Sequence, residues 1–178
     1  MSTTAKVLSL PGSAMVVLIG VAGSGKSTFA YEHFRATEVL SSDFFRGMVS
    51  DDESDQDASA DAFALLHLAL EKRLRRAKLC VVDATNLRAL HRSRLLECAQ
   101  ACSRPAVAMV FETPLAVSVE RAAQRVGRVV KADIVREQAQ TLAPQSDADL
   151  LAEGFVRVFR INPSEEVEIR RTRAAAHG

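Results

Sequence analysis

Residues 20–27 of the chain read GVAGSGKS, and this stretch decides the fold class. It fits the pattern G-x-x-x-x-G-K-[ST], in which glycines allow the backbone to wrap around a phosphate with its N–H groups facing inward. A continuous apolar run, AMVVLIG, leads into it at residues 14–20, and a helix is expected from Lys26 to about Arg35. A buried strand, a glycine-rich loop and a helix in this order predict a phosphate-binding loop rather than a turn with a surface lysine.

The loop predicts a site for a nucleoside triphosphate and a divalent cation. Lys26 is expected to reach the β- and γ-phosphates, and Ser27 is expected to bind Mg²⁺ or Mn²⁺. The dipole of the helix that begins there also favours an anion. ATP or another nucleoside triphosphate is therefore the expected phosphate donor. The expected nucleotide-binding residues of the loop are Gly20, Gly23, Ser24, Gly25, Lys26, Ser27 and Thr28.

Strands and helices alternate along the rest of the chain. Further strands are expected at residues 38–42, 78–86, 105–112 and 154–161. Further helices are expected at residues 58–76, 88–103, 114–126 and 132–142, with a terminal helix from Ser164 and an acidic loop at residues 48–57. This alternation predicts an α/β fold in which helices flank a central parallel sheet.

The composition is that of one globular domain and gives no sign of a membrane partner. The chain has 178 residues, of which 48% are hydrophobic and 25% charged, and its formal net charge is +1. With so little net charge, any site for a polyanion must be a local patch. Three cysteines without a CxxC pair fit a reduced, cytoplasmic protein. The apolar N-terminal region is interrupted by Pro11-Gly12 and is too short for a membrane span.

Asp83 lies at the end of an expected strand, in the sequence VVDATN. In a parallel sheet the carboxyl ends of the strands meet at the ligand-binding edge, so Asp83 is expected to hold the metal shell through water. An aspartate in a strand-end turn is the alternative. Asn86 either caps the following helix or contacts the substrate, and the sequence leaves both roles open.

A basic segment after the fourth strand predicts a helical arginine lid. Thr113 and Pro114 are typical of an N-cap followed by the first helical residue. Arg121 and Arg125 are four residues apart and would share a helix face, with Arg128 just beyond them. We expect these arginines to close on the triphosphate, stabilise the transferring phosphate and exclude water. A solvated basic helix face is the alternative.

The stretch SSDFFRG at residues 41–47 follows the strand that lies next to the phosphate loop in related folds. Asp43 would point into the crevice near the γ-phosphate and accept the proton of an incoming hydroxyl. Arg46 would then bind the phosphate or the acceptor. A helix-capping aspartate with a surface arginine is the alternative. Of the two phenylalanines, one is expected to pack inward and the other to face the acceptor.

Size and motifs favour a small phosphotransferase over other nucleotide-binding proteins. No N/T-K-x-D element for guanine recognition follows a later strand, which disfavours a GTPase switch. A motor ATPase usually has a much longer chain. A regulatory module without turnover is disfavoured because Lys26, Asp43 and Arg121 form a complete set for phosphoryl transfer.

Four segments together resemble the 5′-kinase domain of bacterial polynucleotide kinase-phosphatase, the RNA end-healing and end-sealing enzyme. They are VVLIGVAGSGKSTFA, EVLSSDFFRGMVSDDESDQDASADAF, VVDATN and ERAAQR, and the resemblance extends from about Ala14 to Glu168. The phosphate loop alone occurs in many families. The combination with the second segment is far more specific.

The resemblance implies an α/β fold of the P-loop phosphotransferase type, in agreement with the expected strands and helices. It also implies transfer of the γ-phosphate of ATP or another nucleoside triphosphate to a 5′-hydroxyl RNA or DNA end, in RNA repair. It implies that Asp43 is the general base and that Arg46 is an essential arginine of the acceptor site. Arg121 and Arg125 would contact the nucleotide phosphates, whereas Arg128 aligns less well because VGRVVK departs from the family pattern. The catalytic residues implied are Lys26, Asp43, Arg46, Arg121 and Arg125.

The resemblance also implies partners and a domain division. In the family, the kinase module precedes a phosphatase and a ligase-like module, and an RNA 3′-end methyltransferase is a further partner. Residues 1–170 are expected to form the kinase domain, and residues 171–178 a tail or a linker to such modules.

A P-loop kinase of a small-molecule alcohol is the alternative function, because the same base and phosphate loop would serve it. The acidic residues 51–57 argue mildly against a broad anionic clamp. A 5′ end would then be held only at its terminal nucleotides.

Overall fold

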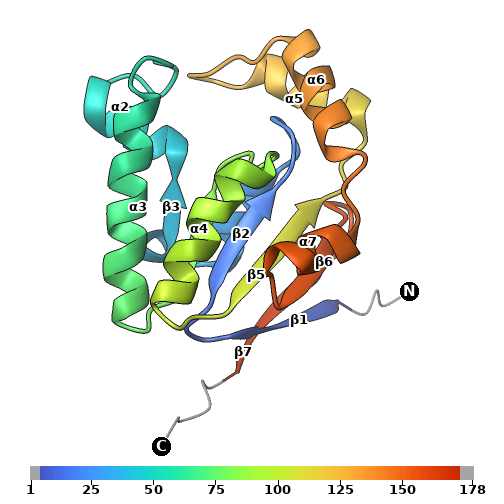
Figure 1. Ribbon diagram of the computed structural model, residues 1–178. Helices are drawn as coiled ribbons and strands as arrows, with labels where there is room; N and C mark the ends of the chain where they lie inside the picture. Colours follow the sequence, from blue (N-terminus) through green and yellow to red (C-terminus); the bar gives the residue numbers. More distant parts are fainter. Residues whose placement is uncertain (1–4, 173–178) are drawn as a thin grey trace, which may run out of the picture.

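A computed structural model describes residues 5–172, and its centre is a five-stranded parallel sheet in the order β3-β4-β2-β5-β6 (Figure 1). The strands of this sheet are β2 (Met15–Ile19), β3 (Val39–Ser41), β4 (Cys80–Asp83), β5 (Ala106–Phe111) and β6 (Arg157–Ile161). Two further strands, β1 (Lys6–Pro11) and β7 (Val167–Thr172), pair in parallel as a separate ribbon. The predicted α/β class with a central parallel sheet is confirmed.

Helices connect the strands and cover both faces of the sheet. They are α1 (Lys26–His33), α2 (Ser42–Ser50), α3 (Ser59–Arg75), α4 (Ala89–Ala101), α5 (Leu115–Gln124), α6 (Ala132–Leu142) and α7 (Asp147–Glu153), with a short 3₁₀ helix, η1 (Ala36–Glu38). Figure 1 shows α3 and α4 in front of the sheet, and α5 and α6 at the upper end, where the phosphate loop lies.

The central strand β2 explains the apolar run that precedes the phosphate loop. All five of its residues are fully buried. Val17 belongs to the core cluster that contains Leu66 of α3, whereas Leu18 belongs to the cluster that contains Phe29 of α1. A strand covered on both faces needs an apolar side chain at every position, so its sequence shows no alternation.

The terminal helix predicted from Ser164 is wrong, because this part of the chain forms strand β7. Val167 and Ile169 alternate with polar residues and pack against the core cluster that β1 also joins. Arg171 forms a bidentate ion pair with the buried Glu38, with both nitrogen–oxygen distances at 2.7 Å. Pairing with the distant strand β1 and this ion pair override the local helix signal of the charged residues.

Helix α2 replaces most of the turn and loop that were expected after β3. The predicted strand at residues 38–42 shortens to β3, and the predicted loop at residues 48–57 begins only after Ser50. The hydroxyl of Ser41 accepts a hydrogen bond from the backbone N–H of Phe44. This serine cap turns the chain directly from β3 into α2.

Helix α5 is shorter than the helix predicted to run to Val126, and its start differs. Thr113 does not cap it, because its hydroxyl donates a 2.7 Å hydrogen bond to the carbonyl of Ser24 in the phosphate loop. Pro114 occupies the N-cap position instead. The helix ends at Gln124, so Arg125 lies at its C-cap and does not share a helix face with the preceding arginine as predicted.

Helix α7 was not predicted from the sequence. Ser146 and Asp149 form a reciprocal capping box at its start, and the helix, with 7 residues, is too short for a clear apolar periodicity. The predicted helices at residues 58–76, 88–103 and 132–142 correspond to α3, α4 and α6.

Both ends of the described chain lie at the β1–β7 ribbon (Figure 1). Arg171 and Thr172 of the predicted tail are the last residues of β7, and the rest of that tail, residues 173–178, lies outside the described residues. Within residues 5–172, no helix combines the length and apolar character needed to cross a membrane.

Candidate active site

The phosphate loop connects the carboxyl end of β2 to the start of α1. Gly23 and Gly25 have φ angles of +77° and +90°, a left-handed region that glycine adopts without strain. A Cβ atom on Gly23 would also overlap the backbone carbonyl of Ser118 in α5. The loop and α5 therefore pack backbone against backbone, which fixes the loop at the carboxyl edge of the sheet.

Lys26 is the buried cation of the loop, with only 7% of its surface exposed. Its Nζ donates hydrogen bonds to the carbonyl of Val21 at 2.7 Å and to the hydroxyl of Ser24 at 3.2 Å. Burial lowers the pKa of Lys26 from 10.5 to about 8, while the carboxylates of Asp83 and Asp43 act in the opposite direction. The two acids therefore lie near enough to Lys26 to share one electrostatic site.

Asp83 and Ser27 offer oxygen ligands for a metal ion beside Lys26. Asp83 is the last residue of β4 and is 4% exposed. Burial raises its pKa, while a hydrogen bond from Ser27 and the charge of Lys26 lower it. Within residues 5–172 no three His, Cys, Asp or Glu side chains gather as a metal cage. One carboxylate and one hydroxyl fit Mg²⁺, which usually completes its shell with water and substrate phosphates.

Three arginines surround the carboxylate of Asp43 in the first turn of α2. Its Oδ1 accepts hydrogen bonds from Arg46 and Arg128, each at 2.6 Å, and its Oδ2 accepts one from Arg125 at 2.7 Å. The Asp43 side chain is 13% exposed. Arg46 is buried as well, and this burial lowers its pKa while Asp43 raises it. Charge-assisted hydrogen bonds of this length are strong, so Asp43 joins α2 to the predicted lid.

The lid consists of α5, α6 and the segment between them, which carries Arg125 and Arg128. Figure 1 shows this segment extending across the end of the sheet toward α2. Val21 of the phosphate loop packs with Ala122 of α5 and Val135 of α6, so the loop anchors the base of the lid. Arg121 faces the loop instead, because its Nη1 lies 3.8 Å from the position of a Cβ on Gly25.

Two contacts to the phosphate loop were not predicted from the sequence. The backbone N–H of Ala22 donates a 2.8 Å hydrogen bond to Oε1 of Gln138 in α6. The backbone N–H of Gly20 donates to the carbonyl of Thr85, just after β4. Gln138 is 116 residues from Ala22, so no local pattern could have revealed this contact.

The structure excludes one of the two roles left open for Asn86, the cap of the following helix. Its side-chain amide donates to the carbonyl of Leu18 at 2.8 Å and to those of Val82 and Ala84 at longer distances. The N-cap of α4 is Arg88. Asn86 therefore ties the ends of β2 and β4 together and does not cap the helix.

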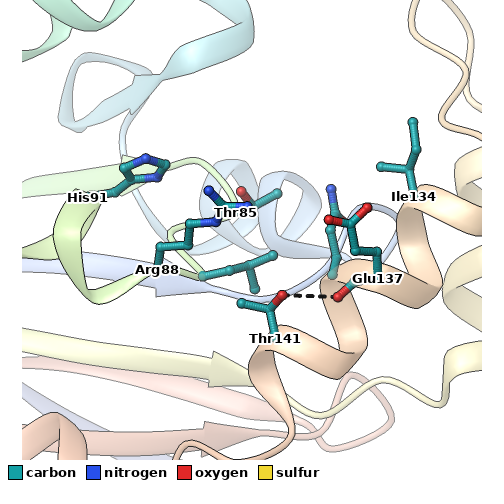
Figure 2. A pocket seen from close by; sticks show the side chains of 8 residues that line it. Thr85, Arg88, His91, Ile134, Glu137 and Thr141 are labelled. Atoms are coloured by element: carbon teal, nitrogen blue, oxygen red, sulfur yellow. Dashed lines mark hydrogen bonds between the residues drawn. The ribbon is translucent and has the colours of Figure 1, made fainter.

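A pocket of about 220 Å³ lies between the start of α4 and α6 (Figure 2). Its lining residues are Thr85, Leu87, Arg88, His91, Ile134, Glu137, Gln138 and Thr141. None of them was predicted as a site residue, because the pocket forms only when the lid helix packs beside the turn after β4.

The sequence profile of the AAA domain family matches residues 15–147, which include the phosphate loop, Asp43, Asp83 and the lid arginines. A search among curated proteins gives no significant match.

Several solved structures share the fold. Chaetomium thermophilum Kti12 in complex with ADP-AlF3 is 15% identical with a TM-score of 0.60, over 84% of this chain and 89% of that one. A gluconokinase from Sinorhizobium meliloti 1021 is 21% identical with a TM-score of 0.50, over 88% and 86%. A chain in the structure of a Pnkp1/Rnl/Hen1 complex is 23% identical with a TM-score of 0.51, over 73% of this chain and only 43% of that one. These similarities show a P-loop kinase-type fold.

Proposed function

The chain belongs to the AAA domain family, and we propose that it transfers the γ-phosphate of ATP to a hydroxyl group, with the 5′-hydroxyl of an RNA or DNA end as the acceptor. One observation carries the proposal: the Asp43 carboxylate lies among Arg46, Arg125 and Arg128 at the edge of the sheet that holds the phosphate loop. Transfer to a hydroxyl needs a proton acceptor and cations around the migrating phosphate, and this cluster supplies both.

The phosphate loop would bind the donor. Lys26 and the N–H groups at the start of α1 would hold the β- and γ-phosphates, with Arg121 beside the loop. Ser27 and Asp83 would hold Mg²⁺ or Mn²⁺, which supplies charge neutralisation on these phosphates when bound.

Asp43 would act on the acceptor. The acceptor oxygen forms a bond to the γ-phosphorus while its proton moves to the Asp43 carboxylate. The bond from the γ-phosphorus to the bridging oxygen breaks, and ADP leaves with the electron pair. Arg125 and Arg128 would exchange Asp43 for the γ-phosphate oxygens during this step, because the carboxylate and the phosphate are both anions that would lie beside this segment of the lid.

Arg46 would keep Asp43 in place while the lid arginines move. Its Nη1 donates both to Asp43 and to the backbone carbonyl of Glu53, at 2.6 and 3.1 Å. This second bond holds the guanidinium in the wall formed by α2 and the turn after it. Arg46 therefore differs from the two lid arginines, whose side chains within residues 5–172 donate hydrogen bonds only to Asp43.

Phe44 favours a polynucleotide as the acceptor. It follows Asp43 in α2 and is 52% exposed, whereas Phe45 is buried, as predicted for one of the two phenylalanines. An exposed aromatic ring beside the base provides a surface on which a nucleobase can stack, and such stacking contributes about 1–3 kcal/mol per base.

The function is tested by transfer of labelled γ-phosphate from ATP to 5′-OH RNA, 5′-OH DNA and a panel of small alcohols. We expect an oligonucleotide to be the better acceptor. The Phe44→Ala variant should raise the KM for the oligonucleotide about tenfold, and the KM for ATP should not change. Leu68→Ala, which removes an apolar side chain of similar exposure on α3, serves as the control. Equal or better use of a small alcohol would overturn the polynucleotide assignment.

A small-molecule alcohol is the second candidate acceptor. The pocket of about 220 Å³ between α4 and α6 supports it. Sites for drug-sized ligands usually have about 300–1,000 Å³, so this smaller pocket suits a small molecule. The gluconokinase among the similar structures is a protein that acts on a molecule of this kind, by its name. The same panel of acceptors separates the two candidates.

A further inference from the structure

The pocket between α4 and α6 has walls of opposite charge (Figure 2). Arg88 and His91 come from the start of α4, and Glu137 and Thr141 come from α6. Neither Arg88 nor Glu137 takes part in an ion pair within the part of the chain that the structure describes. Their hydrogen-bonding groups are therefore available to a ligand that carries both donors and acceptors.

The pocket is attached to the phosphate loop at two points. Thr85 lines the pocket, and its backbone carbonyl accepts a hydrogen bond from Gly20, the first residue of the loop. Gln138 lines the pocket as well, and its Oε1 accepts the hydrogen bond from Ala22. A ligand in the pocket would therefore lie directly against the side of the phosphate loop.

The pocket also lies at the same edge of the sheet as Asp43. Ser41 of β3 pairs in register with Asp83 of β4. Asp43 and Thr85 each follow their member of this pair by two residues, Asp43 in the first turn of α2 and Thr85 in the turn after β4. The base and the pocket wall thus belong to adjacent strand ends, where ligands of parallel α/β sheets bind.

We propose that this pocket binds the hydroxyl-bearing ring of the phosphate acceptor, and this proposal rests on the phosphotransferase function proposed above. Glu137 accepts hydrogen bonds from ring hydroxyl or amino groups, Arg88 donates to ring oxygens, and Leu87 and Ile134 contact the ring faces. The volume admits one ring. Its source is either the terminal nucleoside of a nucleic acid or a free sugar-like alcohol.

Gln138 acts as a positioning residue in this proposal. Its Oε1 already accepts a hydrogen bond from the backbone N–H of Ala22, whereas its Nε2 donates to no group within residues 5–172. The amide can therefore donate to the ring while it holds the loop. This places a single side chain between the acceptor and the triphosphate site.

Two substitutions test the pocket, Arg88→Met and Glu137→Gln, since each removes a charge with little change in side-chain volume. Arg136→Met on α6 is the matched control, because Arg136 is exposed and, within the described residues, its side chain pairs only with Asp133. The probes are adenosine 3′-phosphate and the pyranose sugar glucose, titrated into protein saturated with a non-hydrolysable ATP analogue. The ring that binds identifies the source. Both pocket variants should raise its Kd about tenfold, and the control and the affinity for the ATP analogue should stay unchanged.

Measurements of ring binding and of phosphate transfer test the pocket proposal and the phosphotransferase function separately. If neither ring binds, or if the variants bind it as the wild type does, the pocket proposal is overturned. If a ring binds in the predicted way and yet receives no phosphate from ATP, the pocket stands and the phosphotransferase function fails. Transfer with a raised acceptor KM and an unchanged ATP KM in both pocket variants supports both.

Discussion

Lys26 and Asp43 carry opposite charges at the carboxyl end of the sheet, and each is held by specific contacts. Substitution of either residue tests its role in phosphoryl transfer directly. Lys26 keeps its charge within the loop through bonds to Val21 and Ser24. The Asp43 carboxylate forms ion pairs with three guanidinium groups. A negatively charged ligand on the loop would stabilise the lysine and compete with Asp43 for the arginines, so both residues should respond to nucleotide.

The pKa of Lys26 gives a prediction for stability. Its pKa in the folded protein is about 8, below the ordinary value of 10.5, so the unfolded chain binds the proton more tightly. The contribution of Lys26 therefore becomes more favourable to folding as the pH rises from about 8 to 10.5, by roughly 3 kcal/mol over this range.

Chemical denaturation of the wild type and Lys26→Met between pH 7 and pH 10 measures this contribution. The free energy of unfolding of the wild type should rise relative to that of the variant as the pH increases. A difference between the two proteins that does not depend on pH would contradict the assigned burial of the charge. The variant should also lose phosphate transfer at every pH.

At the scale of the elements, the contact between the phosphate loop and α5 gives a steric prediction. A methyl group on Gly23 would overlap the backbone of Ser118, whereas one on Gly127 would meet no atom within 4 Å. Both glycines have positive φ angles, of 77° and 90°, so alanine is strained at either position by about 1–2 kcal/mol. Only Gly23→Ala adds a clash.

We therefore expect Gly23→Ala to lower the melting temperature more than Gly127→Ala and to weaken ATP binding, since the loop and α5 must separate. Thermal unfolding and ATP titration of the two variants make the comparison. Similar losses in both would mean that the close approach of α5 does not shape the loop.

The lid shows why some elements could be predicted and others not. Strand β2, the loop and α1 follow from one continuous stretch of sequence whose pattern is local. The positions of Arg125 and Arg128 were expected in a lid, but their contact with Asp43 spans 82 and 85 residues. The sequence predicted cations near the nucleotide, which stays a prediction, and the structure adds that both arginines pair with the carboxylate of Asp43.

Across the whole molecule, a long-range ion pair joins helices α4 and α7. Arg92, with 1% of its side chain exposed, forms a bidentate ion pair with Glu153 at 2.6 and 2.7 Å. It also donates to the carbonyls of Asn86 and Leu87, so it joins α7 to the turn that borders the pocket. Buried pairs of this kind are costly to break because removal of one partner leaves a buried charge.

The errors of the sequence prediction also lie at this scale. The segment VEIRRT has charged residues that favour a helix, and only the ribbon with β1 makes it a strand. The pocket residues lie far apart in the chain and have no periodic pattern. The sequence could predict the loop residues, Asp43 and Asp83 because each of them lies at or just beyond the end of a strand that has a recognisable pattern. Their catalytic roles stay predictions.

The most direct test of the central claim is the rate at which Asp43→Asn transfers labelled phosphate from ATP to a 5′-OH oligonucleotide, with ATP affinity measured on the same protein. Asparagine keeps the shape of the side chain and cannot accept the proton as a carboxylate does. We predict a fall in the transfer rate by roughly 10²–10⁴-fold, with ATP affinity no lower than that of the wild type, because the lid arginines lose their carboxylate partner. Transfer at the wild-type rate by the folded variant would contradict the assignment of Asp43 as the base.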